Sequence, residues 1–310
     1  MGSDVIPEIC EQIRMVPKEQ ETIDLLIVSN GGDPIVAWRI IGLLRERFRK
    51  IGVLVPFSAQ SSATILAFGA DEILMHPFSC LGPIDPQITT QAGPTNPPAI
   101  FSVEDIRSYI DFISQDLKLE DPGSNMQALQ HLVSELKPTT IGMVKKSMKL
   151  SESLASKLLS LHMDSKDKID EIVEKYNNLS HHGYTVSRKE AKESGLPVEF
   201  VKSDLEDIMW NIWADIEEEM RCREPFHPMK SISRQPDGAN KLNEAMRSNL
   251  PFSIKVIEEV KIAVVESKYL SSSFGMDEHI TATRNGPSVN YAVEGVPAGW
   301  IRSNIYEENK

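Results

Sequence analysis

In the first quarter of the chain the apolar residues follow two patterns in turn. Some form short continuous runs, and others recur every three or four positions. Residues 23–29 form a short apolar run that ends at Asn30-Gly31-Gly32, which is typical of a buried parallel strand stopping at a tight turn. From Pro34 to Phe48 the apolar residues recur every three or four positions, with arginines between them. This spacing predicts a helix with one apolar face.

The same alternation continues to residue 75. Residues 51–56 form a second apolar run and predict another buried strand. The small residues of segment 58–70 predict a tightly packed helix, and residues 72–75 predict a third short strand. Strands that alternate with helices in this way indicate an α/β layered domain.

The middle of the chain is loop-like at first and then helical. Segment 77–98 contains a proline-rich stretch at 93–98, and residues 103–175 predict helices broken at Pro122-Gly123 and at Pro138. A further short helix is predicted at 187–195. It would be capped by Ser187, with Glu190 three residues on, and would end at Gly195.

The last third changes character. Residues 204–223 predict an acidic amphipathic helix, and alternating residues at 254–269 predict strands. Asn285-Gly286 favours a hairpin turn between two further alternating runs. We therefore divide the chain at 203/204 into a larger domain, 1–203, and a small C-terminal α+β appendage, 204–310, whose role the sequence does not indicate.

The composition and net charge limit the kinds of molecule that the chain can bind. The chain has 310 residues, 41% hydrophobic and 25% charged, enough to bury a core, and its formal charge is −12. Nucleic acid and anionic membranes would repel such a chain, whereas a polypeptide partner would not. The longest apolar stretch, 51–70, is interrupted by polar residues and no secretion signal opens the chain, so we expect a cytoplasmic protein.

Metal and disulfide chemistry find little support in the sequence. The three cysteines, at 10, 80 and 222, are widely spaced and lack a C-x-x-C pair, which favours reduced thiols. His227 and His279 have no spacing typical of a metal site. We therefore expect neither a metal nor a cofactor.

One segment could carry nucleophilic chemistry. Ser61 lies in S-A-Q-S-S-A-T, where small neighbours would admit a substrate carbonyl and expose the amide of Ser62. Gly31 and Gly32 end a predicted strand with free N–H groups, as an oxyanion hole requires. Taken singly each feature is weak, because a serine at a helix start is usually a packing residue or a cap.

Taken together, these segments resemble the Clp/crotonase superfold. Its proteases place a strand, a Gly-Gly oxyanion turn, a helix and a second strand ahead of a nucleophilic serine at the next helix start. The string S-A-Q-S-S-A-T-I-L-A-F-G-A-D, residues 58–71, is similar to the nucleophile segments of signal peptide peptidases and of the Clp proteolytic subunit. The resemblance implies a spiral of β-β-α units with a helical segment, and Ser61 as nucleophile.

Within this superfold the sequence resembles the serine dehydrogenase proteinase family. The most specific motif is L-G-P-I-D-P-Q, which closes the matching segment 70–87. A second motif, H-H-G-Y-T followed by E-A-K-E-S-G-L, lies within 180–196. The resemblance covers about residues 5 to 200 and none of the C-terminal third.

The family's Ser, Asp, His triad falls on Ser61, Asp85 and His182 in this sequence. The resemblance implies that the imidazole takes the serine proton, the carboxylate holds the imidazole, and backbone amides meet the oxyanion. His181 is the alternative base, because the doubled histidine leaves the register open by one residue. Asp85 could instead be a turn former between prolines, and His182 an exposed loop histidine.

The sequence departs from the family pattern in the motifs themselves. Asn30 replaces the proline of Pro-Gly-Gly, and Ala63 replaces the glycine two residues after the serine. Gly183 and Thr185 replace the Asp and Pro of the later motif. Lys146 is a further alternative base, as in serine/lysine dyads, although lysines in helical stretches are usually solvated.

The resemblance implies a serine peptidase that cleaves polypeptides as a homo-oligomer. Met209, Trp210 and Trp213 on the acidic helix could form an interface, or could equally pack onto the protein's own core. The alternative function is a catalytically impaired scaffold or regulatory subunit on the same fold. Crotonase-type acyl-CoA chemistry fits less well, because those enzymes use backbone donors and no nucleophilic serine at this point.

Overall fold

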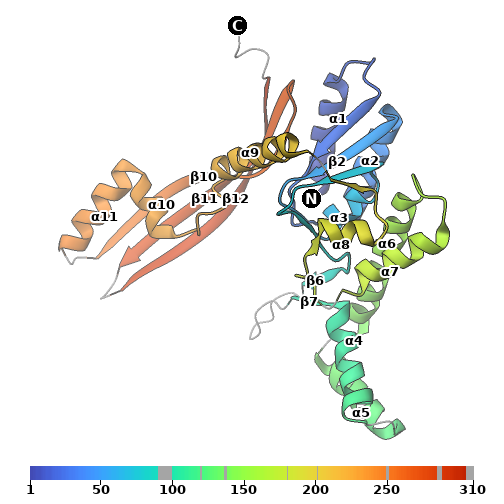
Figure 1. Ribbon diagram of the computed structural model, residues 1–310. Helices are drawn as coiled ribbons and strands as arrows, with labels where there is room; N and C mark the ends of the chain where they lie inside the picture. Colours follow the sequence, from blue (N-terminus) through green and yellow to red (C-terminus); the bar gives the residue numbers. More distant parts are fainter. Residues whose placement is uncertain are drawn as a thin grey trace. The chain divides into compact units, whose positions relative to one another are not determined.

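The protein consists of two compact units, which we describe separately. The computed structural model describes residues 1–89, 100–118, 121–135, 138–179, 181–200, 202–248, 251–284 and 288–304. Unit 1 comprises Met1–Ile6 and Lys18–Asn211, and unit 2 comprises Pro7–Pro17 and Ile212–Lys310 (Figure 1). The sequence prediction divided the chain at 203/204 and kept residues 7–17 in the first domain, so the observed division differs at both places.

Unit 1 contains a parallel four-stranded sheet in the order β1-β2-β4-β9. Its strands are β1 (Thr22–Leu26), β2 (Lys50–Val55), β4 (Glu72–Met75) and β9 (Val198–Glu199). Strand β2 is buried at most of its positions, as its unbroken apolar run predicted for a central parallel strand. The first three predicted strands are therefore present.

A second, smaller sheet in unit 1 has the order β3-β5-β8. Its strands are β3 (Ser58–Ala59), β5 (Cys80–Leu81) and β8 (Val186–Ser187), with β3 parallel and β8 antiparallel to β5. Ser29 joins its edge through a bridge to Ala59. The chain passes from the larger to the smaller sheet three times, after β1, after β2 and after β4. The mixed α/β class is confirmed, and the spiral of β-β-α units stays a prediction.

Helices pack around these sheets. They are α2 (Pro34–Arg47), α3 (Ser62–Ala67), α6 (Pro138–Leu159), α7 (Lys166–Asn177) and α8 (Arg188–Glu193). The side chain of Asp33 caps α2 by accepting the Ile35 N–H at 2.8 Å. Fully buried apolar residues from sheet and helices form one core, in which Phe68 and Tyr176 meet edge to face at 5.1 Å.

The predicted helix over 58–70 was wrong at its start. Residues 58 and 59 pair with β5, and the helix begins only at Ser62. Small residues suit both states, because they fit a close strand contact as well as a packed helix. The helix predicted at 187–195 is α8, with the Ser187 side chain accepting the Glu190 N–H and Gly195 following at φ +95°.

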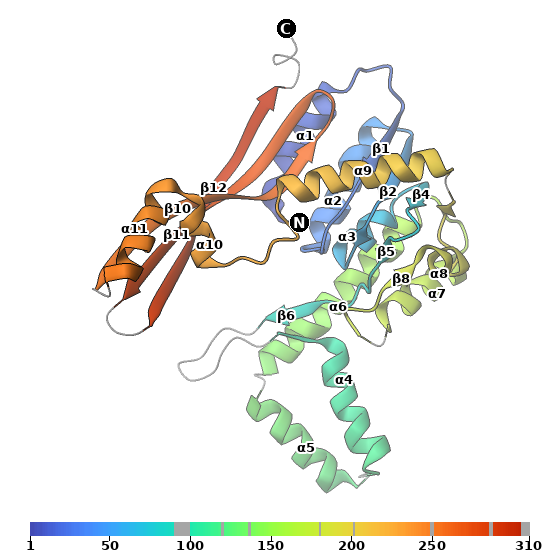
Figure 2. The same cartoon turned by 60° about the vertical axis from the view of Figure 1, so that its left-hand side comes forward.

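The helical segment of unit 1 begins after a two-stranded antiparallel sheet, β6 (Gln87–Thr89) and β7 (Ile100–Ser102). It runs through α4 (Val103–Asp111), a π-helical turn (Phe112–Asp116) and α5 (Pro122–Glu135) into α6 (Figure 2). The predicted breaks at Pro122 and Pro138 are confirmed, since each proline opens a helix, where its missing N–H costs nothing. The proline-rich stretch 93–98 lies outside the described residues.

Unit 2 is built on a three-stranded antiparallel sheet, β10 (Phe252–Glu266), β11 (Leu270–Arg284) and β12 (Val289–Asn304). Helices α10 (Pro228–Arg234) and α11 (Pro236–Ser248) cover part of one face, where Ile232, Leu242, Ile254 and Ile280 are buried together. The predicted turn Asn285-Gly286 lies outside the described residues, although the strands on either side of it pair.

The first helix of the chain packs on the last strands. Helix α1 (Ile6–Met15) places Gln12 Nε2 within 3.0 Å of Val265 O and 2.8 Å of Leu270 O. Its Glu8 carboxylate receives two bonds from the Arg302 guanidinium, at 2.7 and 2.8 Å. These contacts explain why residues 7–17 belong to unit 2.

The acidic helix α9 (Ser203–Glu219) crosses from unit 1 to unit 2 between residues 211 and 212. Its Met209 and Trp213 are buried, and Trp210 stacks on His76 with ring centroids 5.0 Å apart. These side chains therefore pack within the chain, and homo-oligomerisation stays a prediction without their support. Over the described ranges, no helix is long and apolar enough to cross a membrane.

Candidate active site

Ser61 lies in the turn between β3 and α3. Its backbone has φ 52° and ψ −120°, an unusual conformation for a residue other than glycine. The Ala63 N–H donates to Gln60 O at 2.9 Å and closes the turn. Strain of this kind is often found at functional sites, where the surrounding structure holds it in place.

Gly31 lies against this turn. A Cβ atom built on Gly31 would lie 2.7 Å from both Ser61 Cβ and Gln60 O and 3.1 Å from Ser62 N. Gly31 also has φ +100°, a conformation that favours glycine. The position therefore requires glycine for two reasons, and it brings the predicted oxyanion turn next to the predicted nucleophile.

The predicted oxyanion donors differ in their bonding. Ser62 is the first residue of α3, so its amide has no partner within the helix. The Gly31 N–H donates to Ser29 Oγ at 3.0 Å. Gly32 faces the backbone of Met1, whose ammonium group donates to Gly31 O. The Gly31 N–H thus already has a partner within the chain, whereas the Ser62 amide lies at the start of a helix.

Asp85 and His182 are in contact. His182 Nδ1 lies 2.8 Å from Asp85 Oδ1, and the Asp85 side chain is 6% exposed. A carboxylate can only accept, so Nδ1 carries the proton in this bond. In the neutral ring the other nitrogen, Nε2, is then free to accept a proton.

Strand order brings all three predicted triad segments to one end of the smaller sheet. Ser61 follows the end of β3 by two residues, and Asp85 follows the end of the parallel strand β5 by four. His182 precedes the start of β8 by four, and β8 runs antiparallel to β5. The end of one antiparallel strand lies beside the start of the next, so all three segments leave the sheet at the same edge.

The alternative bases lie in less suitable surroundings. His181 is exposed, and its Nδ1 accepts the Gly183 N–H at 2.9 Å within its own loop. Lys146 is exposed on α6. Exposed lysines on helices are ordinarily solvated side chains. Of the doubled histidines, His182 is therefore the one paired with Asp85.

The segment before Asp85 is fixed to the Ser61 turn. A Cβ atom on Gly82 would lie 1.8 Å from Gln60 Oε1, so only glycine lets the Gln60 side chain cross at this point. Gln60 Nε2 then reaches Cys80 Sγ at 3.3 Å. Burial raises the pKa of the Cys80 thiol, although the bond from Gln60 opposes the change, so Cys80 is a poor nucleophile.

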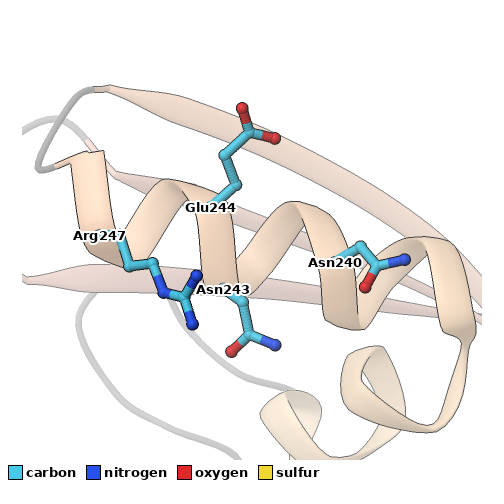
Figure 3. Close-up of a pocket in the computed structure, with 4 residues that line it drawn as sticks. All are labelled: Asn240, Asn243, Glu244 and Arg247. Atoms are coloured by element: carbon cyan, nitrogen blue, oxygen red, sulfur yellow. The ribbon is translucent and has the colours of Figure 1, made fainter.

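A separate shallow concavity of about 480 Å³ lies on α11 in unit 2 and is lined by Asn240, Asn243, Glu244 and Arg247. In Figure 3 the side chains of Asn243 and Arg247 point one way from α11 and that of Glu244 points another. The polar groups do not converge on one point, as binding of a small molecule would require. We therefore place the candidate site at the Ser61 turn.

Comparison with known proteins bears on the same segment. Residues 3–136 match the family model of the ClpP-like SDH-type serine proteinases. The resemblance to the serine dehydrogenase proteinases is confirmed for this segment. The matched segment includes Ser61 and Asp85, whereas His182 lies beyond it. No activity of the chain follows from the match alone.

Two curated relatives come from Methanocaldococcus jannaschii, and both are uncharacterized proteins. One is 30% identical over 200 residues, which are 62% of this chain and 58% of the relative. The other is 38% identical over 81 residues, 26% of this chain and 27% of the relative. The chain thus spans less than two thirds of each relative's length.

Two residues at this site, Thr64 and Gly82, could not be identified from the local sequence pattern. Thr64 forms part of an apolar helix in the sequence, and Gly82 forms part of a proline-containing loop. Both contact partners that lie far away along the chain, so no local pattern could identify them. The functional roles assigned to Ser61, Asp85 and His182 stay predictions.

Proposed function

We propose that the chain is a serine peptidase in which Ser61 is the nucleophile, His182 the general base and Asp85 the residue that orients the imidazole. The observation that carries the proposal is the Asp85–His182 hydrogen bond, at the sheet edge from which the Ser61 turn also leaves. The family match over residues 3–136 supports the same reaction class.

The proposed reaction has two halves. Ser61 Oγ bonds to the peptide carbonyl carbon while His182 Nε2 takes the hydroxyl proton, and the carbonyl electron pair moves onto oxygen. The tetrahedral intermediate then expels the amine, which receives the proton from the imidazole. In the second half a water molecule repeats these steps on the acyl-serine and releases the carboxylic acid.

Backbone amides would stabilise the negative oxygen. The Ser62 amide at the start of α3 is one donor, and the helix end favours negative charge there. Gly31 or Gly32 would supply the second donor. If Gly31 does so, its N–H must break its hydrogen bond to the Ser29 hydroxyl and donate to the oxyanion instead.

A polypeptide substrate agrees with the backbone groups beside the turn. The Asp33 N–H donates to Met1 O at 3.0 Å, and the Met1 ammonium group donates to Gly31 O. The Gly31 carbonyl and the Asp33 N–H thus bond to a neighbouring backbone, as they would to an extended chain lying beside them. We propose that substrate residues next to the scissile bond bind these two groups in place of Met1.

Labelling with a fluorophosphonate probe tests the proposal, because the probe reacts only with an activated serine. We expect wild-type protein to label and Ser61→Ala to lose all labelling. His182→Ala should lose at least about a hundredfold in rate, as for loss of a general base. Asp85→Asn should lose about a thousandfold or more, because the amide favours the wrong tautomer.

The matched controls are His181→Ala and Lys146→Ala, both exposed residues. They should label at rates within about threefold of wild type. If Lys146→Ala does not label while His182→Ala does, a serine/lysine dyad takes the place of the proposed triad.

A non-catalytic scaffold is the second candidate. It is favoured by one observation, the Gly31 N–H already bound to Ser29 Oγ beside the Met1 backbone. A folded wild-type protein that fails to label, and that hydrolyses no unfolded protein substrate, would support this alternative.

A further inference from the structure

Thr64 forms contacts that its place in the sequence does not explain. It lies in α3, one turn after Ser61, and is fully buried. Its hydroxyl lies 2.8 Å from Ala59 O and 3.0 Å from Gly82 O, and accepts the Gly82 N–H at 3.0 Å. A helical threonine normally bonds to a carbonyl three or four residues back, but these partners lie outside the helix.

The two partners of Thr64 belong to the two segments that the candidate site must hold together. Ala59 ends β3, two residues before Ser61, and Gly82 follows β5, three residues before Asp85. The ladder between these strands has only two residue pairs, Ser58 with Cys80 and Ala59 with Leu81. Beyond these pairs the two segments lead to Ser61 and to Asp85.

Where the ladder ends, the Thr64 hydroxyl bonds to both segments and adds to the last backbone bond between them. The Gly82 N–H also lies 3.1 Å from Ala59 O, so hydroxyl, amide and both carbonyls form one buried cluster. This cluster fixes how far the Gly82–Asp85 segment lies from the Ser61 turn. It contains no atom of the proposed triad.

We infer that Thr64 is a positioning residue, whose hydroxyl sets the placement of Ser61 relative to the Asp85–His182 pair. The inference rests on the proposed function. Loss of the hydroxyl would let the two segments move apart by a fraction of an ångström or more. A misplacement of about 1 Å can reduce a rate by about a hundredfold without removing any reacting group.

The test compares Thr64→Val with Thr64→Ser. Valine keeps the shape and lacks the hydroxyl, whereas serine keeps the hydroxyl and lacks one methyl group. We expect the fluorophosphonate labelling rate of Thr64→Val to fall by about 10- to 100-fold, and that of Thr64→Ser to stay within about threefold of wild type. With a peptide substrate, Thr64→Val should lower kcat and leave KM nearly unchanged.

Ser79→Ala is the matched control for lost stability. Its hydroxyl is also buried, but bonds at 2.8 Å to His76 O within its own turn. It should lower Tm by a similar amount and leave the labelling rate within about twofold. If Thr64→Val does not fold, Thr64→Ala and Thr64→Ser differ by the hydroxyl alone and give the same comparison.

The outcomes separate the inference from the proposed function. If wild type labels through Ser61 and Thr64→Val labels no more slowly than Ser79→Ala, the positioning role is wrong and the peptidase proposal stands. If wild-type labelling is absent or survives in Ser61→Ala, the proposed function fails and the role of Thr64 fails with it.

Discussion

Replacing Gly31 by alanine should displace the Ser61 turn. The new Cβ atom would lie 2.7 Å from Ser61 Cβ and Gln60 O, about 0.7 Å short of the 3.4 Å at which ordinary contact begins. Alanine at φ +100° adds a backbone cost of about 1–3 kcal/mol. The chain can relieve both only by moving Gly31 or the turn.

The expected consequence is a slower reaction in a folded protein. A shift of about 0.7 Å at the nucleophile predicts a fall of about 10- to 100-fold in the fluorophosphonate labelling rate. The free energy of unfolding of unit 1 should fall by about 2–4 kcal/mol, from clash and backbone strain together. Labelling kinetics and thermal unfolding, followed on the same samples, measure the two effects.

Gly42→Ala is the matched control. Gly42 lies in the middle of α2, is exposed, and has no atom within 4 Å of its ideal Cβ position. Alanine there should stabilise the helix by about 0.5–1 kcal/mol and leave labelling unchanged. A folded Gly31→Ala protein that labels as fast as wild type would refute the argument that this contact fixes the nucleophile.

Three further predictions concern stability. The Arg302 bonds hold the pKa of Glu8 below its ordinary value of 4.5, so their stabilisation is complete above pH 4.5 and is lost as pH falls through the lowered pKa. Glu8→Gln should therefore unfold about 1–2 kcal/mol more easily at pH 7 and lose this pH dependence in urea titrations. Burial and the charge of Glu258 raise the pKa of Glu278, so its ionised form destabilises the fold at pH 7. In urea titrations Glu278→Gln should therefore increase the free energy of unfolding by up to about 0.5 kcal/mol at pH 7 and not at pH 4. A decrease at pH 7 would contradict the reasoning. Ser62→Ala removes a buried hydroxyl without a hydrogen-bond partner and should leave Tm equal or higher; a fall of several degrees would indicate a missed partner.

The parts of the fold that follow local periodicity could be predicted from the sequence. The run at 51–56 and the arginine-spaced helix from Pro34 each depend on neighbours within a few positions, and both are present as β2 and α2. Ser187 and Glu190 likewise indicated the start of α8. In each case the physical cause lies within one turn or one strand.

The remaining features depend on contacts between distant residues. The split of segment 58–70 into β3 and α3 depends on pairing with Cys80 and Leu81, which the composition of the segment does not encode. The membership of α1 in unit 2 depends on Arg302, almost 300 positions away. Periodicity along one segment carries no information about such partners.

The candidate site could be predicted from the sequence in part. The motif resemblance indicated Ser61, Asp85 and His182, and the hydrogen bond between the last two is present in the structure, whereas their catalytic roles await the labelling experiments. Glycine at position 31 was expected to supply an amide. In the structure its effect on the site is steric, because a side chain at position 31 would collide with Ser61.

The placement of α1 has a consequence for the order in which the chain can fold. During synthesis α1 emerges before most of unit 1, yet the carbonyls of Val265 and Leu270 and the guanidinium of Arg302 that hold it emerge after unit 1. Unit 2 therefore cannot complete its core until β10, β11 and β12 leave the ribosome, whereas the sheets of unit 1 need no residue beyond 199. Until then the polar face of α1, with Glu8 and Gln12, must stay solvated, and a ribosome stalled before β10 should carry a folded unit 1 with an undocked α1.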